Sequence, residues 1–430
     1  MTAPSPPRLT ELTRALPGFN PAAVTLEQAR ALLAAMVVPI AETEACAIGE
    51  ALDRILAGDL ISPINVPAHD NAAMDGFSVQ AADLDPKGET RLVIVAESLA
   101  GRPCPIAPGP GQAVRIMTGA MMPAGHDTVV PRELCRVEGR SLGIPPGQLA
   151  RSNCRMRGED LRAGQTALGI GTRIGPAELG LIASLGLSEV IVRRRARVAF
   201  FSSGDELRGA GQTIAAGQIY DSNRYTLLGM IRRLGAEPID LGIVADQPPA
   251  IEQVINHAAR SADLVISSAG VSKGDADFTQ EALSRLGEVA AWQLLVRPGR
   301  PLAVGRVGKA IYIGLPGNPV AAMLGFIFLA RDVLLALAGA APRPLAIVPA
   351  RLAEPIRKRP GRLEWQRGRL LGGAEADTGE LRVATTGDQG SGILRSMTEA
   401  DCIIVLESDR GDCAAGEWVS CVPMAALLNP

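Results

Sequence analysis

The chain has 430 residues, too many for one hydrophobic core and enough for two to four domains of roughly 100–200 residues each. Apolar residues make up 47% and charged residues 20%, as in folded proteins that bury several cores, which excludes a mainly disordered chain. Aromatic residues are only 3%, and 43 basic against 45 acidic side chains leave a net charge of −2, so general nucleic-acid binding is disfavoured.

The amino-terminal residues and the apolar stretches indicate a cytoplasmic protein. Residues 1–19 are rich in proline and lack the apolar core of a secretory signal. The longest apolar stretch, residues 320–330, ends at Arg331 and Asp332, short of the ~20 residues that span a bilayer. The seven cysteines and three histidines are widely scattered, so neither a zinc site nor a Ser-His-Asp triad is expected.

The first part of the chain predicts helices and then a β-rich module. Thr25 is followed three positions later by Gln28, the pattern of a helix capping box, and apolar residues at helical spacing come next. We therefore expect an amphipathic helix over residues 25–38, and a second, short one over residues 48–57. From residue 63 to residue 162, short alternating segments are interrupted by Gly and Pro, which is typical of β structure.

From residue 194 the pattern changes to alternating strands and helices. Apolar runs and stretches of helical periodicity take turns at residues 197–202, 222–234, 237–244, 248–260, 263–268, 277–286, 309–314 and 319–338. Such alternation predicts parallel strands joined by crossover helices, and hence a doubly wound α/β domain. After a linker with prolines, the chain returns to short strands. The expected domains are a helical/linker domain (20–62 and 163–193), an inserted β-rich domain (63–162), the α/β domain (194–342) and a small, barrel-like β domain (345–430).

Three loops at the ends of predicted strands of the α/β domain carry Gly, and the first two also carry Ser. They read Ser-Ser-Gly-Asp-Glu-Leu over residues 202–207, Ser-Ser-Ala-Gly-Val-Ser-Lys-Gly-Asp-Ala-Asp over 267–277 and Gly-Leu-Pro-Gly-Asn-Pro over 314–319. Ligands of open parallel sheets bind beyond the carboxyl ends of the strands, and the backbone N–H groups of such loops cradle phosphate. Three such loops predict a phosphate-bearing ligand, although each one alone is as well explained by a tight capped turn.

Carboxylates lie in the first two of these loops, at Asp205, Glu206, Asp275 and Asp277, and Asp246 follows the predicted strand over residues 237–244. Acidic side chains beside a phosphate repel it unless a cation intervenes. Mg²⁺ held by one or two carboxylates and by phosphate oxygens resolves this conflict, so we expect a magnesium site. Taken singly, Asp246 and Asp277 are each better explained as helix caps.

Two further segments carry polar groups in stiff or tight backbone. The loop Arg297-Pro-Gly-Arg300-Pro holds two arginines between prolines and a glycine, which suits a compact oxyanion, although a solvated basic turn would look the same. In the β-rich module, Asp75 lies in a Met-Asp-Gly turn and Thr118 follows a predicted strand. Both positions also fit ordinary turn chemistry.

Seven short motifs follow one another along the chain. They are Pro-Ala-His-Asp-Asn-Ala-Ala-Met-Asp-Gly-Phe (67–77), Arg-Ile-Met-Thr-Gly-Ala (115–120), Arg-Gly-Glu-Asp (157–160), Ser-Gly-Asp-Glu-Leu (203–207), Gly-Val-Ser-Lys-Gly-Asp-Ala-Asp (270–277), Gly-Leu-Pro-Gly-Asn-Pro (314–319) and Thr-Gly-Asp-Gln-Gly-Ser (386–391). Each motif is weak alone. Together and in this order they resemble the molybdopterin molybdenumtransferase family, the molybdenum insertases that include the carboxy-terminal domain of gephyrin, from about residue 20 to about residue 425.

The resemblance implies a homodimer in which the helical/linker domain forms the contact between the subunits and the active site lies between them. It implies that molybdate is inserted into adenylylated molybdopterin with release of AMP, that Mg²⁺ is required, and that the molybdenum cofactor passes to molybdoenzymes or their chaperones. It implies catalytic roles for Asp75, Thr118, Asp160, Glu206, Asp246 and Asp277, the last two also as metal ligands. The expected substrate-binding residues are Ser203, Gly204, Gly270, Ser272, Pro316, Gly317 and Pro319, and the expected molybdate-binding residues are Arg297, Arg300, Arg367 and Ser391.

The chain departs from the family pattern at several positions. Where the family usually has Lys-Pro-Gly-Lys-Pro, this chain has Arg297 and Arg300. Arginine keeps the charge and offers paired planar donors to an oxyanion, but it is larger and places those donors differently. Ala269 stands where glycine is common, and Phe77 where tyrosine is common, which removes a hydroxyl group.

Three alternatives remain open from the sequence. The α/β part alone also resembles the domain that adenylylates molybdopterin from ATP, although such an enzyme would not need residues 63–162 or the terminal β domain. The resemblance to gephyrin also allows a scaffold that clusters partner proteins. A preference for tungstate cannot be separated from one for molybdate, because the two oxyanions are chemically so close.

Overall fold

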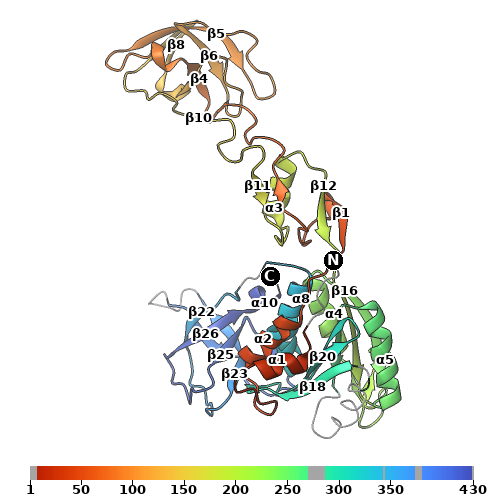
Figure 1. Ribbon diagram of the computed structural model, residues 1–430. Helices are drawn as coiled ribbons and strands as arrows, with labels where there is room; N and C mark the ends of the chain where they lie inside the picture. Colours follow the sequence, from red (N-terminus) through yellow and green to blue (C-terminus); the bar gives the residue numbers. More distant parts are fainter. Residues whose placement is uncertain (1–6, 270–284, 286, 342–343, 373–379, 429–430) are drawn as a thin grey trace. The chain divides into compact units, whose positions relative to one another are not determined.

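The computed structural model describes residues 7–269, 285, 287–341, 344–372 and 380–428 (Figure 1). The chain divides into two compact units. Unit 1 comprises Met1–Glu44, Asp53–Ala57 and Val192–Pro430, and unit 2 comprises Ala45–Leu52 and Gly58–Ile191. Unit 2 is therefore an insertion in the sequence of unit 1, and each unit has its own hydrophobic core.

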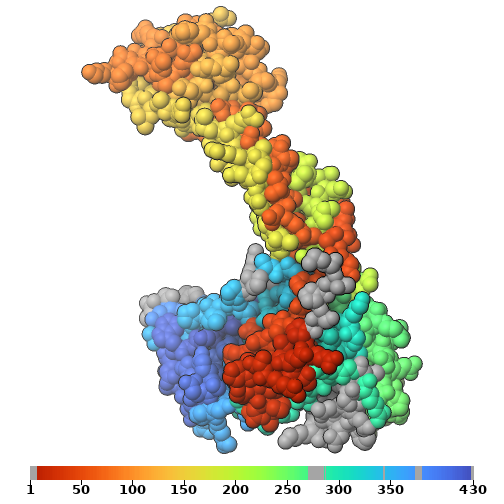
Figure 2. Space-filling view, in the orientation of Figure 1, coloured from red at the N-terminus to blue at the C-terminus, as the bar shows by residue number. Residues whose placement is uncertain are grey.

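Unit 1 begins with the helices α1 (Leu9–Ala15) and α2 (Leu26–Met36). The predicted capping box of α2 is confirmed, because Gln28 N donates to Thr25 Oγ1 at 3.2 Å and Thr25 N donates to Gln28 Oε1 at 3.1 Å. The apolar face of α2 is buried in the main core of unit 1, and Figure 2 shows the two helices at the surface beside the carboxy-terminal strands.

The central sheet of unit 1 has six strands in the order β16, β13, β17, β21, β20, β18. Their bounds are Glu237–Val244, Arg197–Ser203, Leu264–Ser268, Ala310–Leu315, Pro301–Val307 and Gly287–Gln293. The first four are parallel, as predicted, whereas β20 and β18 are antiparallel and extend the sheet beyond the prediction. A tight turn at Gly308 joins β20 to β21, and so short a connection can only make an antiparallel pair.

Helices cover both faces of this sheet. The helices are α4 (Asn223–Arg233), α5 (Pro248–Ser261), α7 (Pro319–Gly325), a π-helical segment (Phe326–Ala330) and α8 (Arg331–Leu337). Successive residues of β13 point to opposite faces, so Val198 and Phe200 join the core with α2, α4 and α7–α8, while Ala199 and Phe201 pack in a second core with α5. The doubly wound α/β architecture is confirmed, and the helix predicted over residues 277–286 lies almost entirely outside the described residues.

The continuous helical segment Pro319–Leu337 is apolar and long enough to cross a membrane by length and composition alone. Within unit 1, however, 78% of its most apolar window is buried, as in the core helix of a soluble protein. Arg331 is buried with it, donating from Nε to Leu427 O at 2.8 Å, which satisfies a cation that a lipid-facing helix would leave exposed.

The carboxy-terminal strands close into a small barrel. The strands β22 (Val348–Leu352), β23 (Leu363–Leu371), β24 (Arg382–Thr385), β25 (Cys402–Leu406) and β26 (Trp418–Pro423) pair in the order β23, β24, β22, β26, β25, and β25 pairs back to β23. Two short helices, α9 (Arg395–Thr398) and α10 (Met424–Leu428), accompany them. Trp365 of β23 stacks on Phe328 with ring centroids 4.5 Å apart, so the barrel packs directly on the helices of the α/β part.

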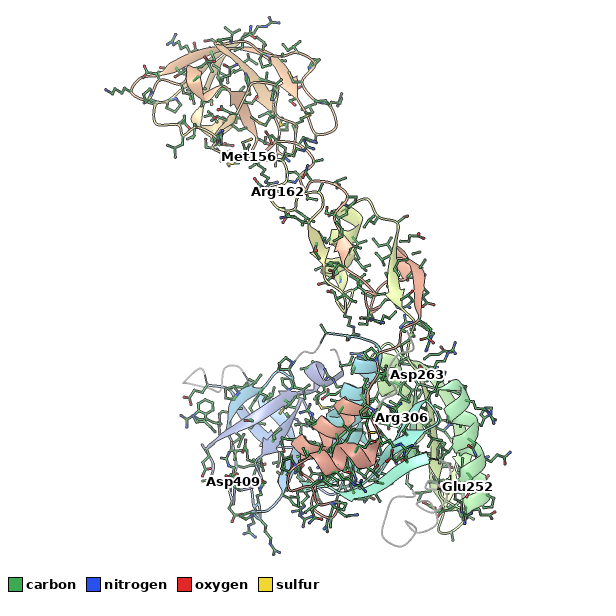
Figure 3. The ribbon with its side chains drawn as sticks, in the orientation of Figure 1. Met156, Arg162, Glu252, Asp263, Arg306 and Asp409 are labelled. Atoms are coloured by element: carbon green, nitrogen blue, oxygen red, sulfur yellow. The ribbon has the colours of Figure 1, made fainter. Side chains whose placement is uncertain are left out.

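A second contact ties the amino-terminal helices to the sheet. The Arg306 guanidinium, labelled in Figure 3, donates to Met36 O at the end of α2 and, at 3.0 Å, to Lys309 O. A cation at the carboxyl end of a helix complements the helix dipole. Burial lowers the pKa of Arg306, yet these carbonyl partners keep the group in place.

Unit 2 is built on a six-stranded sheet in the order β7, β4, β6, β5, β9, β8. Their bounds are Thr128–Pro131, Gly76–Val79, Gln112–Ile116, Thr90–Ser98, Ser141–Ile144 and Arg136–Glu138. The remaining elements of this region are β1 (Thr43–Ala47), β2 (Leu60–Ile61), β3 (Asn71–Ala72), β10 (Cys154–Arg155), β11 (Thr166–Leu168), α3 (Pro176–Ser184) and β12 (Glu189–Arg193). The β-rich character predicted for this region is present.

One predicted helix is wrong. Over residues 48–57 only a 3-10 turn forms, at Ile48–Glu50. Asp53 has φ +64°, outside the range of a right-handed helix, so the chain cannot continue helically past it.

Candidate functional site

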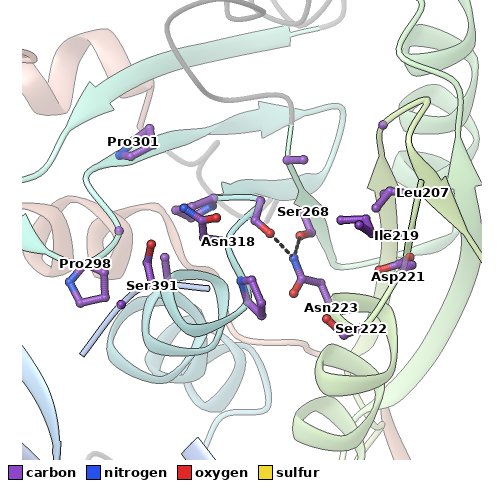
Figure 4. Close-up of a pocket in the computed structure, with 18 of the residues that line it drawn as sticks. Leu207, Ile219, Asp221, Ser222, Asn223, Ser268, Pro298, Pro301, Asn318 and Ser391 are labelled. Atoms are coloured by element: carbon purple, nitrogen blue, oxygen red, sulfur yellow. Dashed lines mark hydrogen bonds between the residues drawn. The ribbon is translucent and has the colours of Figure 1, made fainter. Parts of the chain in front are cut away.

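A cavity of about 790 Å³ lies in unit 1, beyond the carboxyl ends of β13, β17 and β21 (Figure 4). Its wall comes from the loops after these strands, from the start of α4, from the loop after β19 (Val296–Arg297) and from a loop of the carboxy-terminal barrel. The predicted residues that line it are Ser203, Gly204, Glu206, Asp246, Arg297, Pro316, Gly317, Pro319 and Ser391. Its volume suits a nucleotide-sized ligand.

The first wall segment is held by a network around Asp246. Since β13 and β16 are parallel neighbours, Ser203 at the end of β13 and Asp246 just after β16 lie close together, and Ser203 Oγ donates to Asp246 Oδ1 at 3.1 Å. Asp246 N donates to Asp205 Oδ1 at 3.2 Å. Gly204 has φ +152°, a backbone conformation that L side chains rarely adopt, so glycine suits this turn. Both Glu206 and Asp246 are exposed and face the cavity, where their carboxylates can meet a ligand.

Asn223 joins three wall segments and was missed by sequence reasoning. Its Nδ2 donates to Ser268 Oγ and to Gly317 O, each at 2.7 Å, linking α4 to the end of β17 and to the loop after β21 (Figure 4). Asn223 is 8% exposed and its neighbour Asp221 4%, and Asp221 Oδ1 accepts from Arg224 N at 3.1 Å. The Asp-Ser-Asn run before the predicted helix was the available signal, but it suggests only a helix cap.

Ala269 occupies a backbone conformation that favours glycine. Its φ is +77°, in the left-handed region, directly after β17. A Cβ on Gly317 would lie 3.3 Å from the Ala269 Cβ, so the two loops approach closely here. The local conformation thus accounts for the glycine that the resemblance places at this position.

The predicted oxyanion residues are separated by the structure. Arg297 is exposed and lines the cavity with Ser391, whose carbonyl oxygen accepts from Val320 N at 3.0 Å. The Arg297–Pro298 peptide bond is cis. Arg300 is also exposed but is not among the described residues that line the cavity.

Arg367 lies behind the cavity wall rather than in it. It is fully buried, and it donates from Nε to Ser396 Oγ at 2.9 Å and from Nη2 to Gly390 O at 3.1 Å. Its backbone N–H donates to Gln389 Oε1 at 2.8 Å. Burial lowers the pKa of Arg367, and its position indicates that it holds the wall loop that carries Ser391.

In unit 2 the structure pairs two of the predicted residues. Thr118 donates to Asp75 Oδ1 from both its backbone N–H and its hydroxyl, each at 2.7 Å. Both bonds lower the pKa of Asp75, and the backbone bond has the larger effect. Asp160 is exposed on the same unit, and its N–H donates to Val66 O at 3.1 Å.

The described residues fit a magnesium site of the kind that a ligand completes. Gly270, Ser272 and Asp277 lie outside the described residues. Within the described part of the chain there is no cluster of three or more His, Cys, Asp or Glu side chains. The cavity does offer the exposed carboxylates of Glu206 and Asp246, and Mg²⁺ beside phosphates commonly uses only one or two protein carboxylates.

Three family descriptions match successive parts of the chain: "MoeA N-terminal region (domain I and II)" over residues 24–186, "Probable molybdopterin binding domain" over 199–336 and "MoeA C-terminal region (domain IV)" over 349–424. A molybdopterin molybdenumtransferase of Haemophilus influenzae is 38% identical over 94% of this chain and 100% of its own length. One from Nostoc sp. is 40% identical over 70% of each chain. The crystal structure of the molybdopterin biosynthesis moeA protein from Pyrococcus horikoshii OT3 has the same fold, with TM-score 0.80 and 24% identity over 93% of this chain and all of that one.

Proposed function

The chain belongs to the molybdopterin molybdenumtransferase family, and we propose that the cavity of unit 1 is where it works. It is a transferase of molybdenum cofactor biosynthesis that inserts molybdenum. We propose that the cavity takes adenylylated molybdopterin together with molybdate, and that AMP leaves as the metal enters. The observation that carries this proposal is the meeting of phosphate-type loops, carboxylates and Arg297 around one cavity.

The loops after β13 and β21 are proposed to bind the phosphates of the ligand. Ser203, Gly204 and Gly317 line the cavity at these loops, and the two glycines let a phosphate approach the backbone closely. Pro316 and Pro319 fix the shape of the loop after β21, because proline restricts the backbone. Gly270 and Ser272 are proposed to complete this set from the loop after β17.

The carboxylates are proposed to hold Mg²⁺ against the phosphoanhydride. Asp246 and Asp277 would bind the ion, and Glu206 lines the same cavity as Asp246. When bound, Mg²⁺ neutralises charge on the phosphate oxygens as AMP departs. Ser203 donates to Asp246 and so orients the carboxylate that would face the ion.

Molybdate is proposed to bind at the part of the wall that carries Arg297 and Ser391. Arg297 would contact the oxyanion directly with Ser391, since both line the cavity. Arg300 would add long-range attraction, and Arg367 would keep the Ser391 loop in place. The atoms that take up molybdenum are the dithiolene sulfurs of the ligand, not protein thiolates.

We further propose a cytoplasmic homodimer that hands its product to molybdoenzymes or their chaperones. Asp75, Thr118 and Asp160 are proposed to act in the same reaction. Light scattering on the purified protein tests the dimer, and a monomeric mass at micromolar concentration would refute it.

A coupled assay tests the reaction. Purified protein is mixed with adenylylated molybdopterin, molybdate and Mg²⁺, and AMP is measured together with reconstitution of a cofactor-free molybdoenzyme. We expect both products to depend on molybdate and Mg²⁺. No AMP with any divalent metal would refute the proposal, while consumption of ATP with unadenylylated molybdopterin would favour the adenylyltransferase alternative.

A further inference from the structure

A strand pairing between the α/β part and the barrel places an acid opposite Arg297. The short strand β19 runs parallel to the start of β23, with Val296 opposite Leu363 and Arg297 opposite Glu364. Leu363 N donates to Leu295 O at 2.9 Å, which fixes this register. As a result, Arg297 Nη1 lies 3.6 Å from Glu364 Oε2.

Glu364 is the fixed member of this pair. Its side chain is 9% exposed, against 64% for Arg297. Gln366, two residues further along the same strand and so on the same face, donates from Nε2 to Glu364 Oε1 at 2.9 Å. Between them, Trp365 is locked by its stacking on Phe328. The carboxylate is therefore held rigidly, while the arginine has a long, solvated side chain.

The position of Glu364 calls for an explanation in terms of charge. Glu364, Arg297 and Ser391 line the same cavity, where the proposed ligand is a doubly charged oxyanion. A carboxylate facing such an ion repels it, so its presence is explained if it also orients the cation that binds the ion. A guanidinium can pair with Glu364 through one edge and present its remaining N–H donors to a second anion.

We propose that Glu364 is a positioning residue, which holds the Arg297 guanidinium at the cavity so that it binds molybdate. This inference rests on the proposed function, in which Arg297 contacts the oxyanion. Pre-orienting a flexible side chain lowers the entropy lost on binding, so Glu364 strengthens molybdate binding although it carries the same sign of charge.

The test is the variant Glu364→Gln, which keeps the volume and the oxygen that accepts from Gln366. We expect the KM for molybdate to rise roughly two- to fivefold with kcat at saturating molybdate unchanged, because the Arg297 member of the pair is 64% exposed and solvent weakens the pair as it does a surface ion pair. Calorimetric titration with molybdate alone should show the same loss of affinity without turnover. Glu407→Gln is the matched control, because Glu407 pairs with Arg410 at 3.8 Å in the same barrel but is not among the described residues that line the cavity.

A double-mutant cycle shows whether Glu364 acts through Arg297. In an Arg297→Ala background, Glu364→Gln should change the molybdate affinity little, because the group it orients is gone. Equal effects in both backgrounds would overturn the inference, as would tighter molybdate binding by Glu364→Gln, which would show that repulsion dominates. If Arg297→Ala itself leaves molybdate affinity intact, the proposed oxyanion role of Arg297 fails instead.

Discussion

Ala269 carries local backbone strain at the rim of the cavity. An L-residue in the left-handed region costs roughly 1–2 kcal/mol, and glycine avoids that cost while giving the unfolded chain more freedom. We expect Ala269→Gly to raise the free energy of unfolding by about 0.5–1 kcal/mol, because the strain relieved in the folded state exceeds the entropy that glycine adds to the unfolded chain. Urea denaturation checks this, with Ala31→Gly in the middle of the exposed face of α2 as a control that should lose about 1 kcal/mol. A loss of stability in both variants would show that Ala269 is not strained.

His126 makes the stability of unit 2 depend on pH. The ring is 7% exposed, its Nδ1 lies 3.0 Å from Ser78 Oγ, and burial lowers the pKa of His126 below the ordinary 6.5. As pH falls from 6.5 toward the lowered value, the unfolded chain takes up a proton that the folded unit does not, so stability is lost over that window and levels off below it.

Hydrogen exchange measures this effect locally. After correction for intrinsic rates, amides of β4 should show easier opening at about pH 5.5 than at about pH 7.5, because His126 must remain neutral in the folded unit. The variant His126→Asn retains a polar group but does not titrate, and it should abolish the difference. An unchanged pH dependence in that variant would assign the effect to other groups.

Asn223 ties α4 to two loops of the cavity wall. Replacing it with Ala leaves Gly317 O and Ser268 Oγ without their donor, and an unsatisfied buried group costs about 1–3 kcal/mol. We expect Asn223→Ala to lower the free energy of unfolding by about that amount and to weaken AMP binding in calorimetry, because two wall loops lose their common anchor. Asn20→Ala, which removes a bond to Ala22 N on the surface, should leave AMP binding unchanged.

Local patterns predicted the elements whose partners are near in sequence or whose periodicity is strong. The capping box of α2 and the strand-helix alternation from β13 to α8 followed from spacing alone. The antiparallel strands β18 and β20 did not follow, since the pairing of β20 with β21 depends on the tight turn at Gly308 and that of β18 with β20 on the folded register. Asn223 and Glu364 were also invisible, because each acts on a partner 45 or more residues away, and only the folded register brings them together.

The cysteines of the molecule lie away from the candidate site, so their thiol chemistry is not part of it. All seven lie in the described part of the chain, and none lines the cavity. Cys46, Cys402, Cys413 and Cys421 are buried, which leaves Cys104, Cys135 and Cys154 of unit 2 partly accessible. Burial raises the pKa of Cys135 to about 11 and also raises that of Cys154, so both are poor nucleophiles at neutral pH.

Alkylation of the folded protein tests whether any cysteine takes part in the reaction. Iodoacetamide at neutral pH should modify Cys104 first, as mass spectrometry would show, and release of AMP should continue at its normal rate. Loss of activity that follows the labelling of any cysteine would contradict a mechanism in which only ligand sulfurs take up molybdenum. Protection of that cysteine by substrate would place it at the site.

The identity of the whole molecule could be inferred from the sequence, because seven motifs occur in the family's order, whereas the layout of the oxyanion site could not. The motifs predict which loops carry ligand-binding groups, and the cavity does gather nine of the named residues. Arg367 illustrates the limit. The resemblance implies that Arg367 binds molybdate. In the structure Arg367 is buried beneath the loop that carries Ser391 and supports that loop, which the sequence alone does not show.

The insertion of unit 2 within unit 1 also orders events during synthesis. The amino-terminal helices find their partners, Glu288 for Leu9 N and Arg306 for Met36 O, only in strands made far later. Domains fold as they leave the ribosome, so unit 2 can fold while the rest of unit 1 is still being made. During that time the apolar faces of α1 and α2 remain uncovered. Between the completion of unit 2 and the emergence of β20, the nascent chain therefore exposes apolar surface of the kind that favours aggregation.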